Sequence, residues 1–570
     1  MKKLFAFLLT LVMILSLGTS AFAAEDTNLT IQNPDNVTRT YAGYKILTLK
    51  SSLKGDEHEH TCVDNNHIAD CYNYAYEVNS TYKGILQAET FSNAGPTVWA
   101  QGKPGSSDGV TDAHIMAYLT SLTSDSADGY GTLRQAADRI YRAIQANSIP
   151  ADRTGLTGTN NAIDQGYWMF VDVTDLNDSV ESSNSLVIVD TKNLDSLTIA
   201  PKIDVPEVEK KVKDIEDSID SNIQDNYWHD SADFDIGDTV PFKLTATLPS
   251  NTRAYTNYSL TFHDNLSDGF TLDANSIKVY MYETKHKADF DTNLTSGEPL
   301  TLGKDYTLNT TATDCSFELT INVRENNQFN IDGAANDCAF VVYYEAQLNN
   351  SAVIGATGNP NSVILEYSNN PYSNSTGNTT PDVVKVFTYS LEITKIDNHN
   401  HPLEGAEFTL WKKLYMAPES DIPNDPNMSD SDRAKYNNGY RPVGGGKLTG
   451  EGTDKNIFTW KGLDDGDYIL SESKTPDGYN SIEDIVFSID AVHSETADDP
   501  QLISINAGKM GIYTDNPTGE LKQSIVNQTG TELPSTGAEG TIMLITSGSV
   551  LVILAVVFLV TRKKMSIYED

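Results

Sequence analysis

From about residue 203 to residue 530, the chain consists almost entirely of short stretches in which apolar and polar residues alternate, separated by turns rich in Asn, Ser, Asp and Gly. Phe317 to Val323 and Glu407 to Trp411 are typical of these stretches. Alternation places the apolar side chains on one face of a strand, and many short strands of this kind pair into two sheets packed face to face. The pattern therefore predicts β-sandwiches throughout this part of the chain.

The preceding residues mix two periodicities. Strand-like stretches at 39–47, 166–173 and 185–189 frame apolar residues at helical spacing, most clearly Leu133, Ala136, Ala137, Ile140 and Ile144. We expect a mainly β chain of three tandem immunoglobulin-like sandwiches in an elongated rod, the first with a helical insertion. The expected units are 24–202, 203–385 and 386–530. A polar stretch rich in Pro and Gly, 417–446, is expected to be a long insertion loop of the third unit.

Both ends of the chain carry segments of another kind. Residues 1–23 begin with lysines, continue with an apolar stretch and end in Ala-Phe-Ala, which are the three regions of a secretory signal peptide. Near the other end, the apolar run from Ile542 to Val560 is just long enough to cross a bilayer as a helix. The basic residues Arg562-Lys563-Lys564 follow it, which places the residues before the run outside the membrane.

Within the C-terminal segment 531–570, just before this run, the chain reads Leu533-Pro534-Ser535-Thr536-Gly537. The motif, with an apolar segment and a basic tail behind it, resembles the sorting signal of Gram-positive surface proteins that sortase transpeptidases recognise. The resemblance implies cleavage between Thr536 and Gly537, loss of the membrane helix, and transfer of the Thr536 carbonyl to an amine outside the cell. An ordinary transmembrane anchor after a linker is the alternative.

The chain is strongly acidic, with 79 acidic residues against 40 basic ones and a net charge of -39. Such a surface repels polyanions, so no nucleic-acid partner is expected. The sequence has no nucleophile elbow and no phosphate-binding loop. We therefore expect neither enzymatic turnover nor a cofactor.

The cysteines fall into two local pairs, Cys62 with Cys71 and Cys315 with Cys338. An exported chain meets an oxidising compartment, which favours disulfides, so we expect a bond within each pair. The spacing alone does not fix the connectivity.

Histidines flank the first cysteine pair. His58, His60 and His67 could join these thiols as zinc ligands. The spacing matches no closed Cys/His pattern, however, and the stretch is typical of a polar loop. We expect no metal there.

In the third unit, which has no cysteine, a lysine occupies a core position. Lys395 alternates with apolar residues of its strand, and an ammonium in the core is costly unless it is paired or neutralised. Glu472 likewise shares the parity of its apolar neighbours. The two segments resemble the opening strand and the E-box of collagen-adhesin B-type domains in Gram-positive pilins. The resemblance implies a spontaneous isopeptide bond from Lys395 to Asn527, catalysed by Glu472, with Asn516 as the alternative acceptor and a plain ion pair as the alternative to a bond.

The middle unit repeats this arrangement. Lys210, rather than Lys211, shares the parity of the valines in its strand, and Asn361 shares the parity of the apolar residues that follow it. The segment around Asn361 resembles the closing strand of the pilin middle domain, and Asp264 resembles its acidic catalyst. The resemblance implies a bond from Lys210 to Asn361 assisted by Asp264. Asn359 has the same parity and is the alternative acceptor.

A further lysine lies where the first two units join. Ile199-Ala200-Pro201-Lys202 resembles the pilin motif of shaft pilins, with Ala200 where that family usually has Tyr. The prolines on both sides favour an extended, accessible segment. The resemblance implies that Lys202 accepts Thr536 of the next subunit; a solvated linker lysine is the alternative.

Over essentially its full length, the sequence resembles the major (backbone) pilin of a sortase-assembled Gram-positive pilus. The resemblance implies a structural shaft subunit that is secreted, joined head to tail to copies of itself, and anchored to peptidoglycan in the cell wall. Its partners would be pilus-specific and housekeeping sortases, minor pilins and a host ligand. The alternative is a singly wall-anchored adhesin or minor pilin whose first unit binds a host ligand.

Overall fold

The structure is a computed structural model of the chain. It describes residues 26–54, 72–100, 102–124, 130–176, 181–192, 194–215, 227–415, 417–510, 512–513 and 518–529. The predicted signal peptide, the predicted sorting signal with its apolar segment, and the histidines and cysteines between 55 and 71 lie outside the described residues. In the ranges above, no helix is both long enough and apolar enough to cross a membrane.

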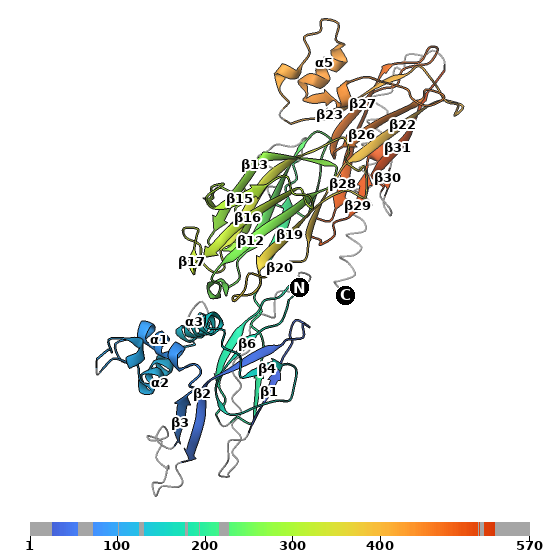
Figure 1. Cartoon of the computed structure of the whole chain (residues 1–570). Coiled ribbons are helices and arrows are strands. Elements are labelled where there is room, and N and C mark those ends of the chain that lie inside the picture. The colour runs from blue at the N-terminus through green and yellow to red at the C-terminus, as the bar shows by residue number, and fades with distance from the viewer. Residues whose placement is uncertain are drawn as a thin grey trace, which may run out of the picture.

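Figure 1 shows an elongated molecule in which groups of β-sheets follow one another from the N-terminal residues at one end to those before the sorting signal at the other. We name three parts by their expected bounds: the N-terminal unit (24–202), the middle unit (203–385) and the C-terminal unit (386–530). Buried apolar side chains of the middle unit form one cluster from Val212 to Val386, and those of the C-terminal unit form another from Phe387 to Ile525. The prediction of a mainly β chain is confirmed.

The N-terminal unit combines two sheets with three helices. The sheets have the strand orders β5-β1-β8 and β3-β2-β6-β7, with β4 also paired to β2. Helix α3 buries Ala136, Ala137, Ile140 and Ile144 on one face, as its periodicity predicts. The elements are β1 (Thr27–Ile31), β2 (Tyr41–Lys54), β3 (Tyr72–Val78), α1 (Lys83–Asn93), α2 (Asp112–Ser121), α3 (Thr132–Ala146), β4 (Arg153–Leu156), β5 (Asn161–Ile163), β6 (Gly166–Asp172), β7 (Leu186–Asp190) and β8 (Ser196–Ile199).

The middle unit is built from two sheets, β10-β21-β19-β12-β16-β15 and β14-β13-β18-β11-β9. Alternate residues of each central strand point inward, so the apolar faces of the two sheets form the core. The elements are β9 (Glu207–Val212), β10 (Ser231–Asp233), β11 (Thr239–Thr247), β12 (Tyr258–Leu266), β13 (Phe270–Tyr282), α4 (Lys285–Phe290), β14 (Glu298–Pro299), β15 (Tyr306–Asn309), β16 (Phe317–Glu325), β17 (Gln328–Phe329), β18 (Ala339–Leu348), β19 (Asn359–Ser368), β20 (Thr376–Asn378) and β21 (Asp382–Phe387).

The C-terminal unit packs a sheet β26-β22-β31 against a sheet β24-β23-β27-β28-β29-β30. Its first strand, β22, and its last, β31, are parallel neighbours. The elements are β22 (Tyr389–Asp397), β23 (Glu407–Lys413), α5 (Asp430–Asn437), β24 (Tyr440–Pro442), β25 (Leu448–Thr449), β26 (Ile457–Leu463), β27 (Gly466–Lys474), β28 (Ile485–His493), β29 (Leu502–Asn506), β30 (Ile512–Tyr513) and β31 (Glu520–Asn527).

One expectation for the C-terminal unit is wrong. The polar stretch 417–446 is not simply a loop, because it contains α5 and the short strand β24, which pairs with β23. The ring of Tyr436 packs edge-on against Trp411 at 5.2 Å, and Lys435 forms an ion pair with Asp484 at 2.7 Å. These few contacts to the sandwich give a polar segment enough anchoring to fold.

Direct contacts join consecutive units. Between the N-terminal and middle units, the backbone N–H of Asn184 donates to the carbonyl of Asn369 at 2.8 Å. Between the middle and C-terminal units, Lys412 Nζ lies 2.5 Å from an oxygen of Asp235. The junctions therefore carry specific polar contacts rather than free linkers.

Candidate functional site

The middle unit buries Lys210 completely at the end of the sandwich. Lys210 is on β9 and has none of its surface exposed. Its ammonium donates hydrogen bonds to the carboxylate of Asp264, on β12, and to the hydroxyl of Tyr344, on β18, at 3.0 Å. Strand alternation thus brings a buried amine to a buried acid, as expected, and adds a tyrosine that the sequence analysis did not identify.

Tyr344 connects this pair to Asn361. Its hydroxyl donates to Asp264 Oδ1 at 2.9 Å and accepts a hydrogen bond from Asn361 Nδ2 at 2.7 Å. Asn361 is fully buried, and its Oδ1 has no hydrogen-bond partner. The carboxamide carbonyl is therefore available for a proton donor within a fully buried cluster.

Burial sets the protonation of this cluster. It lowers the pKa of Lys210 to about 8, although the adjacent Asp264 opposes the shift. Burial also raises the pKa of Asp264, against the opposing effect of Lys210. Both shifts lower the cost of converting the ion pair to a neutral amine and a protonated acid, which is the combination needed for nucleophilic attack by nitrogen.

The alternative acceptor in the middle unit, Asn359, has different surroundings. Its Oδ1 accepts a hydrogen bond from the backbone of Val353 at 2.7 Å, and its Nδ2 donates to the carbonyls of Val353 and Val386. Its carboxamide is thus held by backbone groups, whereas Asn361 lies in the cluster of Lys210.

The C-terminal unit contains a second buried lysine. Lys395, on β22, is fully buried and donates hydrogen bonds to the carbonyls of Ile525 at 3.0 Å and Ile396 at 3.2 Å. Burial lowers its pKa to about 8, opposed by the charges of Glu472 and Asp397.

Glu472 and Asn527 meet beside this lysine. Asn527 Nδ2 donates to Glu472 Oε1 at 2.8 Å, while the Oδ1 of this buried asparagine has no hydrogen-bond partner. In the parallel pair β22–β31, Lys395 lies opposite Ile525, two residues before Asn527 and on the same face. The structure thus brings together the amine, the acid and the carboxamide predicted from the sequence. The alternative acceptor, Asn516, lies outside the described residues.

Lys202 lies in the irregular stretch between β8 and β9, where the first two units join. Its side chain is exposed, while the preceding Pro201 is buried. Its backbone N–H donates to Ser185 Oγ at 3.3 Å. The backbone is therefore held against the N-terminal unit, and the amine faces solvent.

The expected disulfide between Cys315 and Cys338 is wrong, because both thiols are free. Cys315 precedes β16 at the end of the sandwich where Ser316 bonds to the backbone of Asp264. Cys338 precedes β18 at the opposite end, where its carbonyl accepts from Leu248. The two cysteines are near each other in the sequence, but the strands that follow them belong to different sheets. Sequence spacing alone does not reveal this. The pair Cys62 and Cys71 lies outside the described residues.

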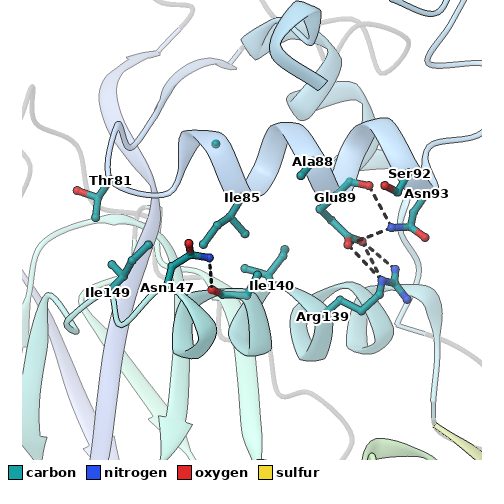
Figure 2. A pocket seen from close by; sticks show the side chains of 12 residues that line it. Thr81, Ile85, Ala88, Glu89, Ser92, Asn93, Arg139, Ile140, Asn147 and Ile149 are labelled. Atoms are coloured by element: carbon teal, nitrogen blue, oxygen red, sulfur yellow. Dashed lines mark hydrogen bonds and ion pairs between the residues drawn. The ribbon is translucent and has the colours of Figure 1, made fainter. Parts of the chain in front are cut away.

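A pocket of about 650 Å³ lies between helices α1 and α3 of the N-terminal unit. Figure 2 shows its two charged lining residues, Glu89 and Arg139, paired with each other, and Asn93 donating to Glu89. Tyr118 also donates to Glu89 at 2.6 Å. These contacts hold the helices together, so the charged groups of the pocket have structural partners already.

Two family models match the C-terminal part of the chain. Residues 389–500 match the SpaA model, a prealbumin-like fold domain, which covers most of the unit that contains Lys395 and Glu472. Residues 525–566 match the LPXTG cell wall anchor motif, which covers the predicted sorting signal.

The chain is 26% identical over 424 residues to the trypsin-resistant surface T6 protein of Streptococcus pyogenes serotype M6, a match covering 66% of this chain and 73% of that protein. The solved T6 backbone pilin of that serotype aligns with 90% of this chain and 100% of its own, at 17% identity and a TM-score of 0.47. The full-length major pilin RrgB of Streptococcus pneumoniae aligns with 66% of this chain and 85% of its own, at 12% identity and a TM-score of 0.37. The chain thus contains a prealbumin-like SpaA domain and an LPXTG cell wall anchor motif, and it is similar over about two thirds of its length to a streptococcal surface protein.

Proposed function

We propose that this protein is a major pilin, the repeating subunit of a covalent shaft in which the C-terminal Thr536 of one copy is joined to Lys202 of the next. A pilus-specific sortase cleaves the Thr536–Gly537 bond and carries the threonyl carbonyl as a thioester. The Lys202 amine attacks that carbonyl, and an amide replaces the thioester. A housekeeping sortase then transfers the last subunit to a peptidoglycan amine, and minor pilins join the same polymer.

The observation that carries this proposal is the position of Lys202. It is an exposed amine on a segment whose backbone is held by Ser185, so it can be reached by a bulky enzyme without unfolding a unit. Donor and acceptor are different surfaces of the subunit, and such heterologous contacts produce an open filament rather than a closed ring. The test is whether producing cells make SDS-resistant multimers that depend on Lys202. A singly anchored adhesin would make none.

Two internal amide bonds, Lys210–Asn361 and Lys395–Asn527, complete the proposed subunit. In each, the neutral lysine Nζ attacks the asparagine Cγ while the carboxylic acid, Asp264 or Glu472, protonates Oδ1. The resulting carboxylate takes a proton from Nζ and passes it to the leaving nitrogen; as ammonia departs and the carbonyl re-forms, Oδ1 gives its proton back to the carboxylate. The support is that each buried lysine shares a cluster with one acid and one asparagine whose Oδ1 has no partner.

The soluble 24–536 chain should weigh about 34 Da less than its reduced sequence mass, because each bond releases one ammonia of about 17 Da. Intact mass spectrometry of the purified, reduced chain measures this loss. Peptide mapping should place the branched peptides at the two lysines. A mass equal to the sequence mass would rule out both bonds.

Tyr344→Phe should slow formation of the bond in the middle unit without preventing it. The hydroxyl positions Asp264 and Asn361 by two hydrogen bonds, but it is neither the nucleophile nor the acid. The fraction of freshly folded chain that still lacks the mass loss, followed over hours, measures the rate. Tyr343→Phe is the matched control, because Tyr343 directly precedes Tyr344 in β18 and points to the other face of the sheet. This variant should form the bond at the rate of the parent chain.

A further inference from the structure

Cys315, which has no disulfide partner among the described residues, lies beside two other metal-binding side chains on the outer face of the middle unit. His263 of β12 and Glu318 of β16 are directly opposite each other in the antiparallel pair. One donor atom from each of the three side chains lies within 4.8 Å of the other two. All three side chains are partly exposed, so solvent reaches the space between them.

The spacing fits a tetrahedral metal ion. His263 Nδ1 lies 3.5 Å from Glu318 Oε1. Two ligands bound to zinc at about 2.0 to 2.3 Å, at the tetrahedral angle, are about 3.3 to 3.8 Å apart. Cys315 Sγ lies within 4.8 Å of a donor atom of each of the other two side chains, and it donates to the Phe317 carbonyl at 3.3 Å.

The second nitrogen of the His263 ring faces a carboxylate, as is common for histidines that bind a metal. His263 Nε2 lies 3.5 Å from Glu366 Oε2, on the strand β19 at the other side of β12. A metal-binding histidine commonly donates its second N–H to a carboxylate, which fixes the ring and its tautomer. Glu318 and Glu366 thus have separate roles, one as ligand and one as the group that orients the ring.

We propose that His263 Nδ1, Cys315 Sγ and Glu318 Oε1 form a binding site for a divalent zinc-type ion, oriented by Glu366. On binding, the thiol and the ring nitrogen Nδ1 release their protons, and the sulfur, nitrogen and oxygen each form one bond to the metal. A water molecule completes the tetrahedron, because the donors are open to solvent on one side. A mixed set of nitrogen, sulfur and carboxylate ligands favours Zn²⁺ over Ca²⁺ or Mg²⁺, which prefer oxygen.

The site is independent of the proposed polymerisation. Its ligands lie on β12, on β16 and just before β16, and these two strands already pair. Metal binding should therefore stabilise this part of the sheet without altering the fold. Neither Lys202 nor the Lys210 cluster supplies a ligand.

Cobalt is a suitable probe, since a thiolate bound to Co²⁺ gives a charge-transfer band in the near ultraviolet. The protein is the metal-free, reduced 24–536 chain with Cys62→Ser and Cys71→Ser, so that only the thiols of the middle unit can report. We expect one Co²⁺ per chain, the charge-transfer band, and displacement of cobalt by Zn²⁺ with a rise in Tm.

Matched variants identify the ligands. Cys315→Ser should abolish the band, whereas Cys338→Ser, which changes the other thiol of the unit, should retain it. Glu366→Gln should keep the band and weaken Co²⁺ binding about 10- to 100-fold. Absence of the band in the parent chain, or its persistence in Cys315→Ser, would overturn the site. Unchanged affinity in Glu366→Gln would overturn the assigned orientation of His263.

Discussion

Changing Lys202 to alanine should reduce the SDS-resistant ladder of pilin multimers on producing cells to a single monomer band. The proposed polymer contains one Thr536–Lys202 amide per junction, and alanine has no amine to attack the enzyme-bound thioester. The loss should be complete rather than partial, because each added subunit needs the same acceptor. Immunoblots of wall material released by a muralytic enzyme and boiled in SDS would measure it. The monomer should stay wall-anchored, because its own Thr536 is intact.

Two variants make this result specific. Lys202→Arg keeps the positive charge but lacks a nucleophilic amine, so it should lose the ladder as alanine does. Lys304→Ala removes another exposed lysine, with 72% of its side chain accessible, and should leave the ladder unchanged. A full ladder in Lys202→Arg would show that another amine is the acceptor. Absence of a ladder in the parent strain would favour the singly anchored adhesin.

Glu472→Gln should leave the C-terminal unit without its internal bond. Glutamine keeps the shape and can still accept the hydrogen bond from Asn527, but it supplies no acidic proton. The 24–536 chain should then weigh about 16 Da more than the parent: the retained ammonia adds about 17 Da and the substitution removes about 1 Da. In the chain-entropy model, losing a link that closes a loop of this length lowers the free energy of unfolding by about 5 kcal/mol. Intact mass and denaturant unfolding test the two effects.

The controls for this prediction come from the same unit. Glu392→Gln changes a partly exposed acid on the outer face of β22 and should retain the bond. Asn527→Ala should lose the bond as Glu472→Gln does, whereas Asn516→Ala should retain it. If Asn516→Ala alone prevents the ammonia loss, the acceptor has been assigned to the wrong asparagine. If Glu472→Gln still loses two ammonia molecules, the acid has no catalytic role.

Strand parity explains why much of the candidate site could be predicted. A buried strand has a period of two, so apolar neighbours are enough to place Lys210 and Lys395 in the core, where both are fully buried. The choice between Asn359 and Asn361 could not be made in this way, since both have the inward parity and both are buried. It depends on which residues from other strands surround each carboxamide, and that is a tertiary property.

Contacts between sheets account for what the sequence analysis missed. Tyr344 belongs to a typical apolar strand, and nothing local distinguishes it from the core tyrosines that have no such role. The wrong disulfide prediction for Cys315 and Cys338 has the same origin. The prediction assumed that cysteines near each other in sequence are near each other in space, but the chain between them passes from one sheet of the sandwich to the other. Residues 430–437 form a helix in a polar stretch because Trp411 and Asp484, distant in sequence, contact it.

The parallel pairing of β22 with β31 also determines how tension would pass through the C-terminal unit. A pull along the shaft enters at the start of β22 and leaves at the end of β31, and a Lys395–Asn527 bond would connect these strands directly. The force would then pass through the covalent link and bypass residues 396–526. Helix α5 and its surrounding segment would be outside the load path, so their sequence could change without weakening the filament.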